Sequence, residues 1–509
     1  MKHSTSLTPH ATLSVHEHLE ELLHTGLQAV LKTNLAEPRA GAGRPRELPS
    51  LSLWLAVVVG ILRGVRSFRA IWRLLVVGGL QSLPCYAISD EAVYDRLEGE
   101  GTHPLEELFA RLSLVLAQWL RPHAEHAAKK HGPLAPFAAD VVALDETVLD
   151  PVARKLPLLR QFRKGACQLL PGKLVAVLDV RLQQWRAIEY VADAKQNSKK
   201  HARQMLKYLA PGTLILADLG YFGFAWFDEL TQAHFWWVSR LREKTSYTVI
   251  HTYYRQGETF DGLVWLGAYE AKAGLAVRLV EFRVGATLLR YVTNVTDPHQ
   301  LSMREIARLY ARRWDIELAF LTLKRELGLH LLWSSKAQLI LIQVWAVLIL
   351  AQLVQALRME VALRAEVDPF EVSLPLLLEA LPLMQMPGRD AISECVSRGR
   401  TLGIIRPSSR LQVQAPEVEP TQLAPLPAHL CLPLGRTPCY PEEAVRAAPS
   451  PAPAVMPPPR VSQPGEQDSP PSAVPEGVTL HPRPPQDWTL RSRGGKLVRV
   501  PLPPERKVS

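Results

Sequence analysis

Cysteine is scarce in this sequence, and its five copies are scattered at Cys85, Cys167, Cys395, Cys431 and Cys439. No two of them form a CxxC pair, so neither a disulfide framework nor a zinc site is indicated. An unbroken apolar stretch is also missing near the N-terminus, because His16, Glu17 and His18 interrupt it, and we therefore do not expect export. Both absences favour a cytoplasmic location.

Acidic residues are in the minority, since 49 Asp and Glu stand against 59 Lys and Arg and give a net charge of +10. This balance suits a polyanionic partner, although an ordinary basic surface gives the same count. The chain of 509 residues is 47% hydrophobic, which is enough for two or three domains with a buried core.

One long apolar run, Leu339 to Leu357, is about long enough to span a bilayer as a helix. Gln343, Gln352 and Gln355 interrupt it, and their amides would be costly in hydrocarbon without partners. We therefore expect a buried core helix and no membrane partner. Apolar helical sequence continues to about Leu383 and offers more surface than one small core readily buries, which favours a homodimer.

Residues 1–130 are predicted to form a basic helical domain that binds DNA. Within it, Ser89 followed by Asp90 and Glu91 opens a short helix, which is either a recognition helix or an ordinary capped helix. Residues 43–46 (GRPR) resemble a minor-groove arm, a composition that many loops share.

The periodicity then changes to strands alternating with a helix over residues 131–241 and to strands alone over residues 242–296. Strands are expected at residues 137–144, 173–180, 185–191 and 213–217, with a helix at 199–209. The first three strands are close enough in sequence to form an antiparallel meander. The second region reads as a β insertion, with strands at residues 247–254, 263–269, 277–284 and 288–295.

Helical sequence returns over residues 297–404, and the remaining residues 405–509 hold more than half of the 42 prolines. Such a proline-rich tail is expected to be disordered, and we assign it no catalytic role. Its basic end could touch DNA without sequence preference.

A polar stripe follows the capping box formed by Ser302 and Glu305. At about 100° per residue, Tyr310, Arg313, Glu317 and Lys324 fall within an arc of roughly 60° on one helix face. Mixed charges often serve solubility alone. Apolar neighbours on both sides of this stripe favour a functional face that is pressed against a core.

Two aspartates occupy the positions where an acidic site needs them. Asp145 ends the apolar run at residues 141–144, and Asp218 ends the run at residues 214–217. A strand end is rigid and open at one edge of a sheet, so two neighbouring strand ends can bring their carboxylates to one ion.

The spacing of the stripe resembles a known signature. Tyr310, Arg313, Glu317 and Lys324 match the YREK pattern of bacterial insertion-sequence DDE transposases of the IS-four family. Residues 144–147 (LDET) resemble the first-Asp motif of that family, with Glu in the place where Gly often stands. Residues 218–221 (DLGY) resemble the second-Asp motif. The resemblance covers roughly residues 50–360 and implies an α/β fold, an RNase H-like catalytic core interrupted by the β insertion.

The resemblance also implies a reaction and a site. Asp145, Asp218 and Glu317 would hold two Mg²⁺ ions, with Mn²⁺ as a substitute, for nicking, hairpin formation and strand transfer. The implied partners are double-stranded DNA, as transposon ends and target, and a second copy of the chain at the bacterial nucleoid. Contacts with DNA are expected from Tyr310, Arg313 and Lys324 at phosphates and from Trp265 as a stacking platform for a flipped base.

Two alternatives stay open. A simple RNase H-like nuclease would use the same metal site without strand transfer. A catalytically inactive, transposase-derived protein would bind DNA only, and the complete acidic triad of Asp145, Asp218 and Glu317 argues against it.

Overall fold

The computed structural model describes residues 47–77, 84–149, 172–192, 196–334, 336–380, 391–410, 412–440, 488–493 and 496–501. The GRPR motif lies outside these ranges. Two compact units divide the chain, residues 1–447 and residues 448–509. The second unit contributes an antiparallel pair of strands, β10 (Trp488–Arg493) and β11 (Lys496–Pro501).

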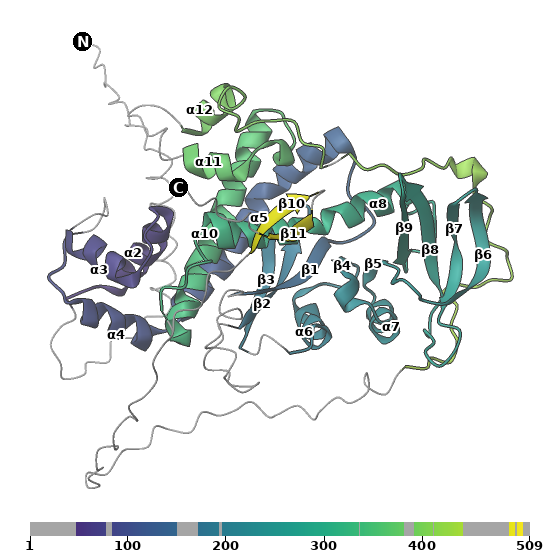
Figure 1. Ribbon diagram of the computed structural model, residues 1–509, viewed down its shortest axis with the longest axis horizontal. Coiled ribbons are helices and arrows are strands. Elements are labelled where there is room, and N and C mark those ends of the chain that lie inside the picture. The colour runs from purple at the N-terminus through teal and green to yellow at the C-terminus, as the bar shows by residue number, and fades with distance from the viewer. Residues whose placement is uncertain are drawn as a thin grey trace, which may run out of the picture. The chain divides into compact units, whose positions relative to one another are not determined.

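Helices precede the sheet of the first unit: α2 (Ser50–Leu62), α3 (Phe68–Val77), α4 (Asp90–Glu100) and α5 (His103–His131). The Ser89 hydroxyl accepts a hydrogen bond of 3.2 Å from the Ala92 amide, so α4 is capped as the sequence predicted. The long helix α5 packs along α10 (Ala337–Arg364), as Figure 1 shows. The last helix of the predicted N-terminal domain is therefore part of the central core.

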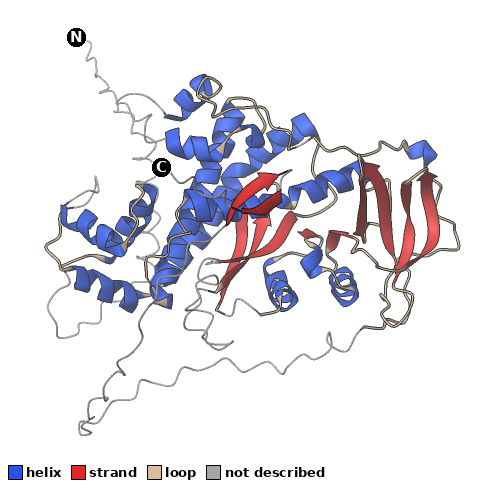
Figure 2. Cartoon of the chain, viewed as in Figure 1, coloured by secondary structure: helices blue, strands red, loops and turns tan. Residues whose placement is uncertain are grey.

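A nine-stranded sheet runs through this unit in the order β3-β2-β1-β4-β5-β9-β8-β7-β6 (Figure 2). Its strands are β1 (Val141–Val148), β2 (Lys173–Asp179), β3 (Gln184–Val191), β4 (Leu214–Ala217), β5 (Trp236–Arg240), β6 (Tyr247–Gln256), β7 (Thr259–Leu266), β8 (Val277–Val284) and β9 (Thr287–Thr293). The first three form the expected antiparallel meander, and β4 and β5 run parallel to β1. This half is the RNase H-like part of the α/β fold.

The β insertion continues the same sheet. Residues 238–240 of β5 pair antiparallel with residues 291–293 of β9, and β8, β7 and β6 follow outward. The four strands expected over residues 242–296 are all present. Because β9 occupies the edge of β5, the backbone groups of that strand are paired rather than left open.

Helices cover both faces of the core half of the sheet. Val141 and Ala143 join the larger hydrophobic core with α5 and α10, and Val142 and Leu144 join a smaller core. The smaller core includes α6 (Ser198–Met205) and α7 (Phe224–Gln232), with short 3₁₀ turns at η3 (Leu206–Tyr208) and η4 (Leu219–Tyr221). Since side chains alternate along a strand, Asp145 falls on the face of Val141 and Ala143.

The polar stripe lies on α8 (Met303–Arg312), α9 (Trp314–Leu321) and a π-helical turn, η5 (Thr322–Glu326). Ser302 and Glu305 form the predicted capping box, with bonds of 3.2 and 2.9 Å. Arg313 joins the two helices with helical angles, φ −54° and ψ −33°. The π-helical turn changes the angular spacing, so the predicted arc applies along α8 and α9 but not to Lys324.

Helix α10 is long and apolar enough to cross a membrane, yet 78% of its most apolar window is buried inside the protein. Its glutamines are partnered, as a core helix requires. Gln352 accepts a bond of 2.9 Å from the Trp185 amide, and Gln343 accepts one of 3.0 Å from the Trp333 amide. The apolar surface of α10 is thus mostly buried within its own chain. The sequence had favoured a homodimer because it counted this surface as available for a partner.

Beyond α10, the chain forms η6 (Pro369–Glu371), α11 (Leu374–Ala380) and α12 (Ala391–Arg398), and η8 (Pro420–Gln422) follows. We name residues 404–440 the C-terminal strap. Contrary to the expectation of a disordered tail, the strap makes specific contacts: Cys439 bridges to Lys272, and the Ala424 amide donates to the Tyr253 carbonyl at 2.7 Å. In the strap, prolines disfavour regular helix and sheet but leave isolated hydrogen bonds to neighbouring strands available. The pair β10 and β11 also contradicts the expected disorder, and residues 488–500 contain no proline.

Candidate active site

Two aspartates lie on neighbouring strands at the centre of the sheet. β1 and β4 are parallel, and their register pairs Leu144 with Ala217. Asp145 and Asp218 directly follow these two partners, so their backbones are neighbours at the same end of the pair. β4 ends before Asp218 as expected. β1 continues to Val148 alongside β2, so Asp145 lies within its strand and not at the tip.

Electrostatics link these two acids to the third. The pKa of Asp145 is raised from 3.8 to about 7, mainly by burial, and the negative charges of Asp218 and Glu317 raise it further. The Glu146 amide, which donates to Asp145 Oδ1 at 2.8 Å, and the charge of Arg313 act in the opposite direction. Asp218 and Glu317 therefore both lie within electrostatic reach of Asp145.

Glu317 is held by a residue of the same stripe. Arg313 Nη1 lies 2.7 Å from Glu317 Oε1, and the arginine side chain is 7% exposed whereas the glutamate side chain is 35% exposed. The Arg313 guanidinium also lies 4.8 Å from the Trp314 ring centroid and 5.7 Å from that of Tyr310. This pairing balances the Glu317 charge, whereas within the described part of the chain Asp145 and Asp218 have no equivalent ion pair.

The three acids suit a divalent metal by their chemistry, although within the described ranges no three His, Cys, Asp or Glu side chains are grouped closely enough to hold one as they stand. Glu317 is paired with Arg313 in this arrangement. Carboxylate oxygens are nevertheless the ligands that Mg²⁺ prefers. Burial is the main cause of the raised pKa of Asp145, and a cation bound at the three acids would relieve the smaller repulsion from Asp218 and Glu317.

Two other stripe residues border the acids. Tyr310 is buried, its ring centroid is 5.2 Å from that of Tyr291, and burial raises its pKa to about 12. Lys324 donates to the Thr147 hydroxyl at 2.5 Å, which ties η5 to β1 only two residues beyond Asp145. Burial lowers the pKa of Lys324. Tyr310 is thus packed inward, and Lys324 reaches the strand of the first acid.

Trp265 lies on β7, away from the strands that carry the acids in the order of the sheet. Its ring is half-buried, and the Arg436 guanidinium lies 4.8 Å from the ring centroid. Arg436 is itself held by the backbone carbonyls of Leu266, Gly267 and Ala273. The strap therefore covers one side of the aromatic ring that sequence reasoning offered as a stacking platform.

Sequence reasoning missed the partners of Glu146. Lys173, which is 0% exposed, donates to Glu146 Oε2 at 2.8 Å, and the Ser198 hydroxyl donates to Glu146 Oε1 at 2.8 Å. The Glu that replaces the familiar Gly is thus tied to β2 and α6. Lys173 at the start of the otherwise apolar strand β2 was the sequence signal that could have predicted a buried acidic partner.

Tyr221 was quoted only as part of the second-Asp motif, yet its hydroxyl belongs to the site. That hydroxyl is buried and has no hydrogen-bond partner in the described chain. Burial and the charges of Asp145, Glu146 and Asp218 raise the pKa of Tyr221 well above its ordinary value. It is therefore a neutral donor beside the acids.

A group of cations lies along the segment that follows Asp218. Arg242 donates to the Leu219 carbonyl at 3.2 Å, and a side chain at Gly223 would come within 3.1 Å of Lys199 Nζ. Burial and the charges of Arg242 and Arg203 lower the pKa of Lys199. Arg203 is paired with Glu229 at 2.7 Å. Like charges held together beside the second acid favour an anion there.

A meander with two further parallel strands, and an acid on its first strand that feels the charges of two others, is consistent with an RNase H-like DDE core. Residues 140–353 match the model of the family described as Transposase DDE domain, which supports a DDE transposase family. This family implies DNA binding and metal-dependent DNA cleavage. No curated protein matched the sequence.

Proposed function

We propose that this protein is a cut-and-paste DNA transposase of the YREK group, with Asp145, Asp218 and Glu317 as its catalytic acids. The observation that carries the proposal is electrostatic: one half-buried carboxyl group, Asp145, feels the charges of the other two acids. Side chains from β1, the end of β4 and α9 converge there, although 172 residues separate Asp145 from Glu317.

The three acids would hold two divalent ions, with Mg²⁺ preferred and Mn²⁺ as a substitute, and bound ions would supply an activated oxygen nucleophile and a stabilised leaving oxygen. The protein's own side chains position the DNA. Arg313 leaves Glu317 and contacts a phosphate, since a guanidinium binds phosphate in the same bidentate manner as it binds a carboxylate. Lys324 and the cations around Lys199 hold the backbone on either side of the acids.

Acid substitutions test this assignment. Asp145→Asn, Asp218→Asn and Glu317→Gln should each abolish Mg²⁺-dependent cleavage of transposon-end DNA while leaving end binding intact, because each removes a charge and little volume. Asp140→Asn is the matched control, because Asp140 immediately precedes β1 at its other end and pairs with Arg186. Substantial cleavage by one of the three variants would remove that residue from the site.

A simple nuclease is the second enzyme that the acids would serve. The two differ in what the liberated 3′-hydroxyl does next, since only a transposase passes through a hairpin and joins ends to target DNA. Precut ends incubated with plasmid should yield joined products. Cleavage without hairpin or joined products would establish the nuclease.

End recognition is proposed to lie in the N-terminal helices, within the predicted domain of residues 1–130. Arg66, just before α3, and Arg73, on α3, are both exposed. Because α5 packs along α10, the full chain is the proper test object. Arg66→Ala with Arg73→Ala should weaken end binding and flatten its salt dependence. Unchanged binding would move recognition elsewhere.

A homodimer on paired DNA ends, in the bacterial cytoplasm at the nucleoid, completes the proposal. Only the resemblance to the transposase family supports a homodimer, because α10 is buried in its own chain. An excess of Glu317→Gln protein mixed with wild type on paired ends should give complexes with one end cut. Cutting in simple proportion to bound wild type, regardless of pairing, would show independent monomers.

Trp265 remains the proposed stacking platform for a flipped base. The base would use the ring face opposite Arg436 or displace that guanidinium. Trp265→Ala should slow hairpin formation more than the first nick, and equal effects on both steps would argue for a packing role.

A further inference from the structure

Two acids on α9 point to different sides of the helix. Asp315 and Glu317 are two residues apart, and at about 100° per residue their side chains leave the axis in nearly opposite directions. Glu317 is 35% exposed in its side chain, and Asp315 is 0% exposed. Asp315 thus lies behind the active site.

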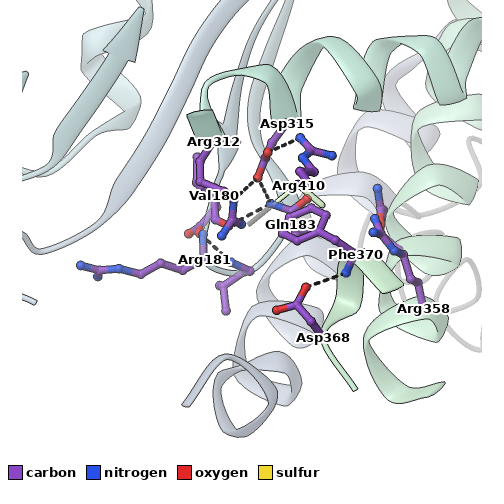
Figure 3. A network of polar contacts seen from close by, with 12 residues as sticks. Val180, Arg181, Gln183, Arg312, Asp315, Arg358, Asp368, Phe370 and Arg410 are labelled. Carbon is purple, nitrogen blue, oxygen red and sulfur yellow. Dashed lines mark hydrogen bonds and ion pairs between the residues drawn. The ribbon is translucent and has the colours of Figure 1, made fainter. Parts of the chain in front are cut away.

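Three donors converge on Asp315, and Figure 3 shows them around its carboxylate. Arg312 Nε and Gln183 Nε2 each donate to Oδ2 at 2.7 Å. Arg410 Nη2 donates to Oδ1. These donors come from α8, from the turn between β2 and β3, and from the C-terminal strap. The buried carboxylate therefore joins three separate parts of the chain to α9.

Arg410 is fixed from behind by Phe370. The guanidinium lies 4.4 Å from the Phe370 ring centroid, and that of Arg312 lies 4.5 Å from the same ring. The strap is anchored at this point, because the Arg406 amide donates to the Glu371 carbonyl at 2.9 Å and Ile405 bridges to Val372. Arg410 therefore reaches Asp315 from a rigid base.

We propose that Arg410 is a positioning residue for the active site, acting through its ion pair with Asp315 to set α9 and with it Glu317. The inference rests on the proposed function of Glu317. Arg410 lies beyond residues 140–353, so the chain uses a segment outside its DDE domain to fix the third acid of that domain. Breaking one ion pair at a buried carboxylate leaves a charge that α9 relieves by shifting toward solvent.

The test compares two full-length variants. Arg410→Ala removes the strap's contact with Asp315. Arg304→Ala is the matched control. Arg304 lies on α8 and forms an ion pair with the exposed Glu417 of the same strap, but it does not contact Asp315. In metal-free protein, Arg410→Ala should speed hydrogen exchange of the α9 amides by about ten-fold, and the Mg²⁺ concentration for half-maximal cleavage should rise by about the same factor. DNA binding in EDTA should stay within about two-fold of wild type.

Arg410→Lys keeps the cation and should fall between wild type and Arg410→Ala. Identical α9 exchange and Mg²⁺ dependence in Arg410→Ala and Arg304→Ala would overturn the proposal. If Arg410→Ala does not fold, Arg410→Lys and Gln183→Ala test the proposal through hydrogen exchange of the α9 amides and the Mg²⁺ dependence of cleavage. A wild-type protein that fails to cleave DNA would instead defeat the proposed function, and the exchange measurement on α9 would still stand.

Discussion

Glu317 and Asp315 are chemically alike and only two residues apart, yet their surroundings are opposite. Asp315 is fully buried and accepts bonds from three donors. Glu317 is partly exposed and has Arg313 as its ion-pair partner in the described structure. An acid that fixes the fold is saturated with donors, because a buried charge without partners is costly. An acid that binds a substrate or metal instead has carboxylate oxygens that few protein donors occupy.

The sharpest way to break this comparison is to neutralise each acid in turn. Glu317→Gln should lower cleavage by about 10³-fold or more, because several kcal/mol of transition-state stabilisation are lost. Its free energy of unfolding should fall by only about 1–2 kcal/mol, because the buried Arg313 guanidinium loses a partner that is itself partly exposed. Asp315→Asn should instead lower the free energy of unfolding by about 3–5 kcal/mol, since Arg312 and Arg410 lose their charged partner.

Cleavage assays and urea denaturation measure the two effects separately. An Asp315→Asn protein as stable as wild type would show that the buried cluster is not a structural anchor. A loss of stability in Glu317→Gln as large as that in Asp315→Asn would show that this acid also fixes the fold.

The pH dependence of stability extends the comparison to Asp145. Its pKa rises from 3.8 to about 7 on folding, mainly through burial, so the folded state holds an extra proton between these values. Stability from this group is therefore present at low pH and is lost as the pH rises through about 7. In EDTA, the free energy of unfolding of Asp145→Asn relative to that of wild type should therefore rise by on the order of 2–4 kcal/mol between pH 4 and pH 8.

Denaturation of both proteins at several pH values provides the test. A constant difference between them would mean that Asp145 ionises as an ordinary surface acid. The measurement needs no cleavage activity and therefore reports on the electrostatics of the acids alone.

The smallest expected effect separates two neighbouring lysines on α6. Lys199 lies in the group of cations beside the second acid, and Lys200 is exposed on the same helix. Lys199→Ala should weaken DNA binding by about three- to ten-fold and reduce the salt slope by about one. Lys200→Ala should change neither, and equal effects of the two substitutions would mean that the cations act only through net charge.

The sequence predicted the elements that carry the site but not all of their detail. The four-residue run ending before Asp218 and the capping box at Ser302 are local signals, and both elements begin or end as expected. β5 and α7 were not singled out, since an aromatic-rich stretch suits either a strand or a helix. Asp145 was placed at a strand tip because its apolar run ends there, whereas β1 goes on to pair with β2.

The strap shows where composition misleads. Proline content misses the β10–β11 pair near the end of the tail, and it carries no information on whether single residues such as Arg410 and Arg436 find partners far away in the sequence. Such contacts depend on which carbonyls, rings and carboxylates the rest of the fold leaves within reach.

The sequence by itself determined most of the strands and the capped helix with its polar stripe, and it supplied the three acids proposed for the site, because these depend on side-chain chemistry and local spacing. Only the tertiary structure decided that Leu144 pairs with Ala217 and that α9 crosses β1. It also decided that Asp315, and not Glu317, receives the buried donors. The physical reason is that charge, burial and hydrogen bonding act over distances in space, and residues more than a hundred positions apart become neighbours only when the sheet forms.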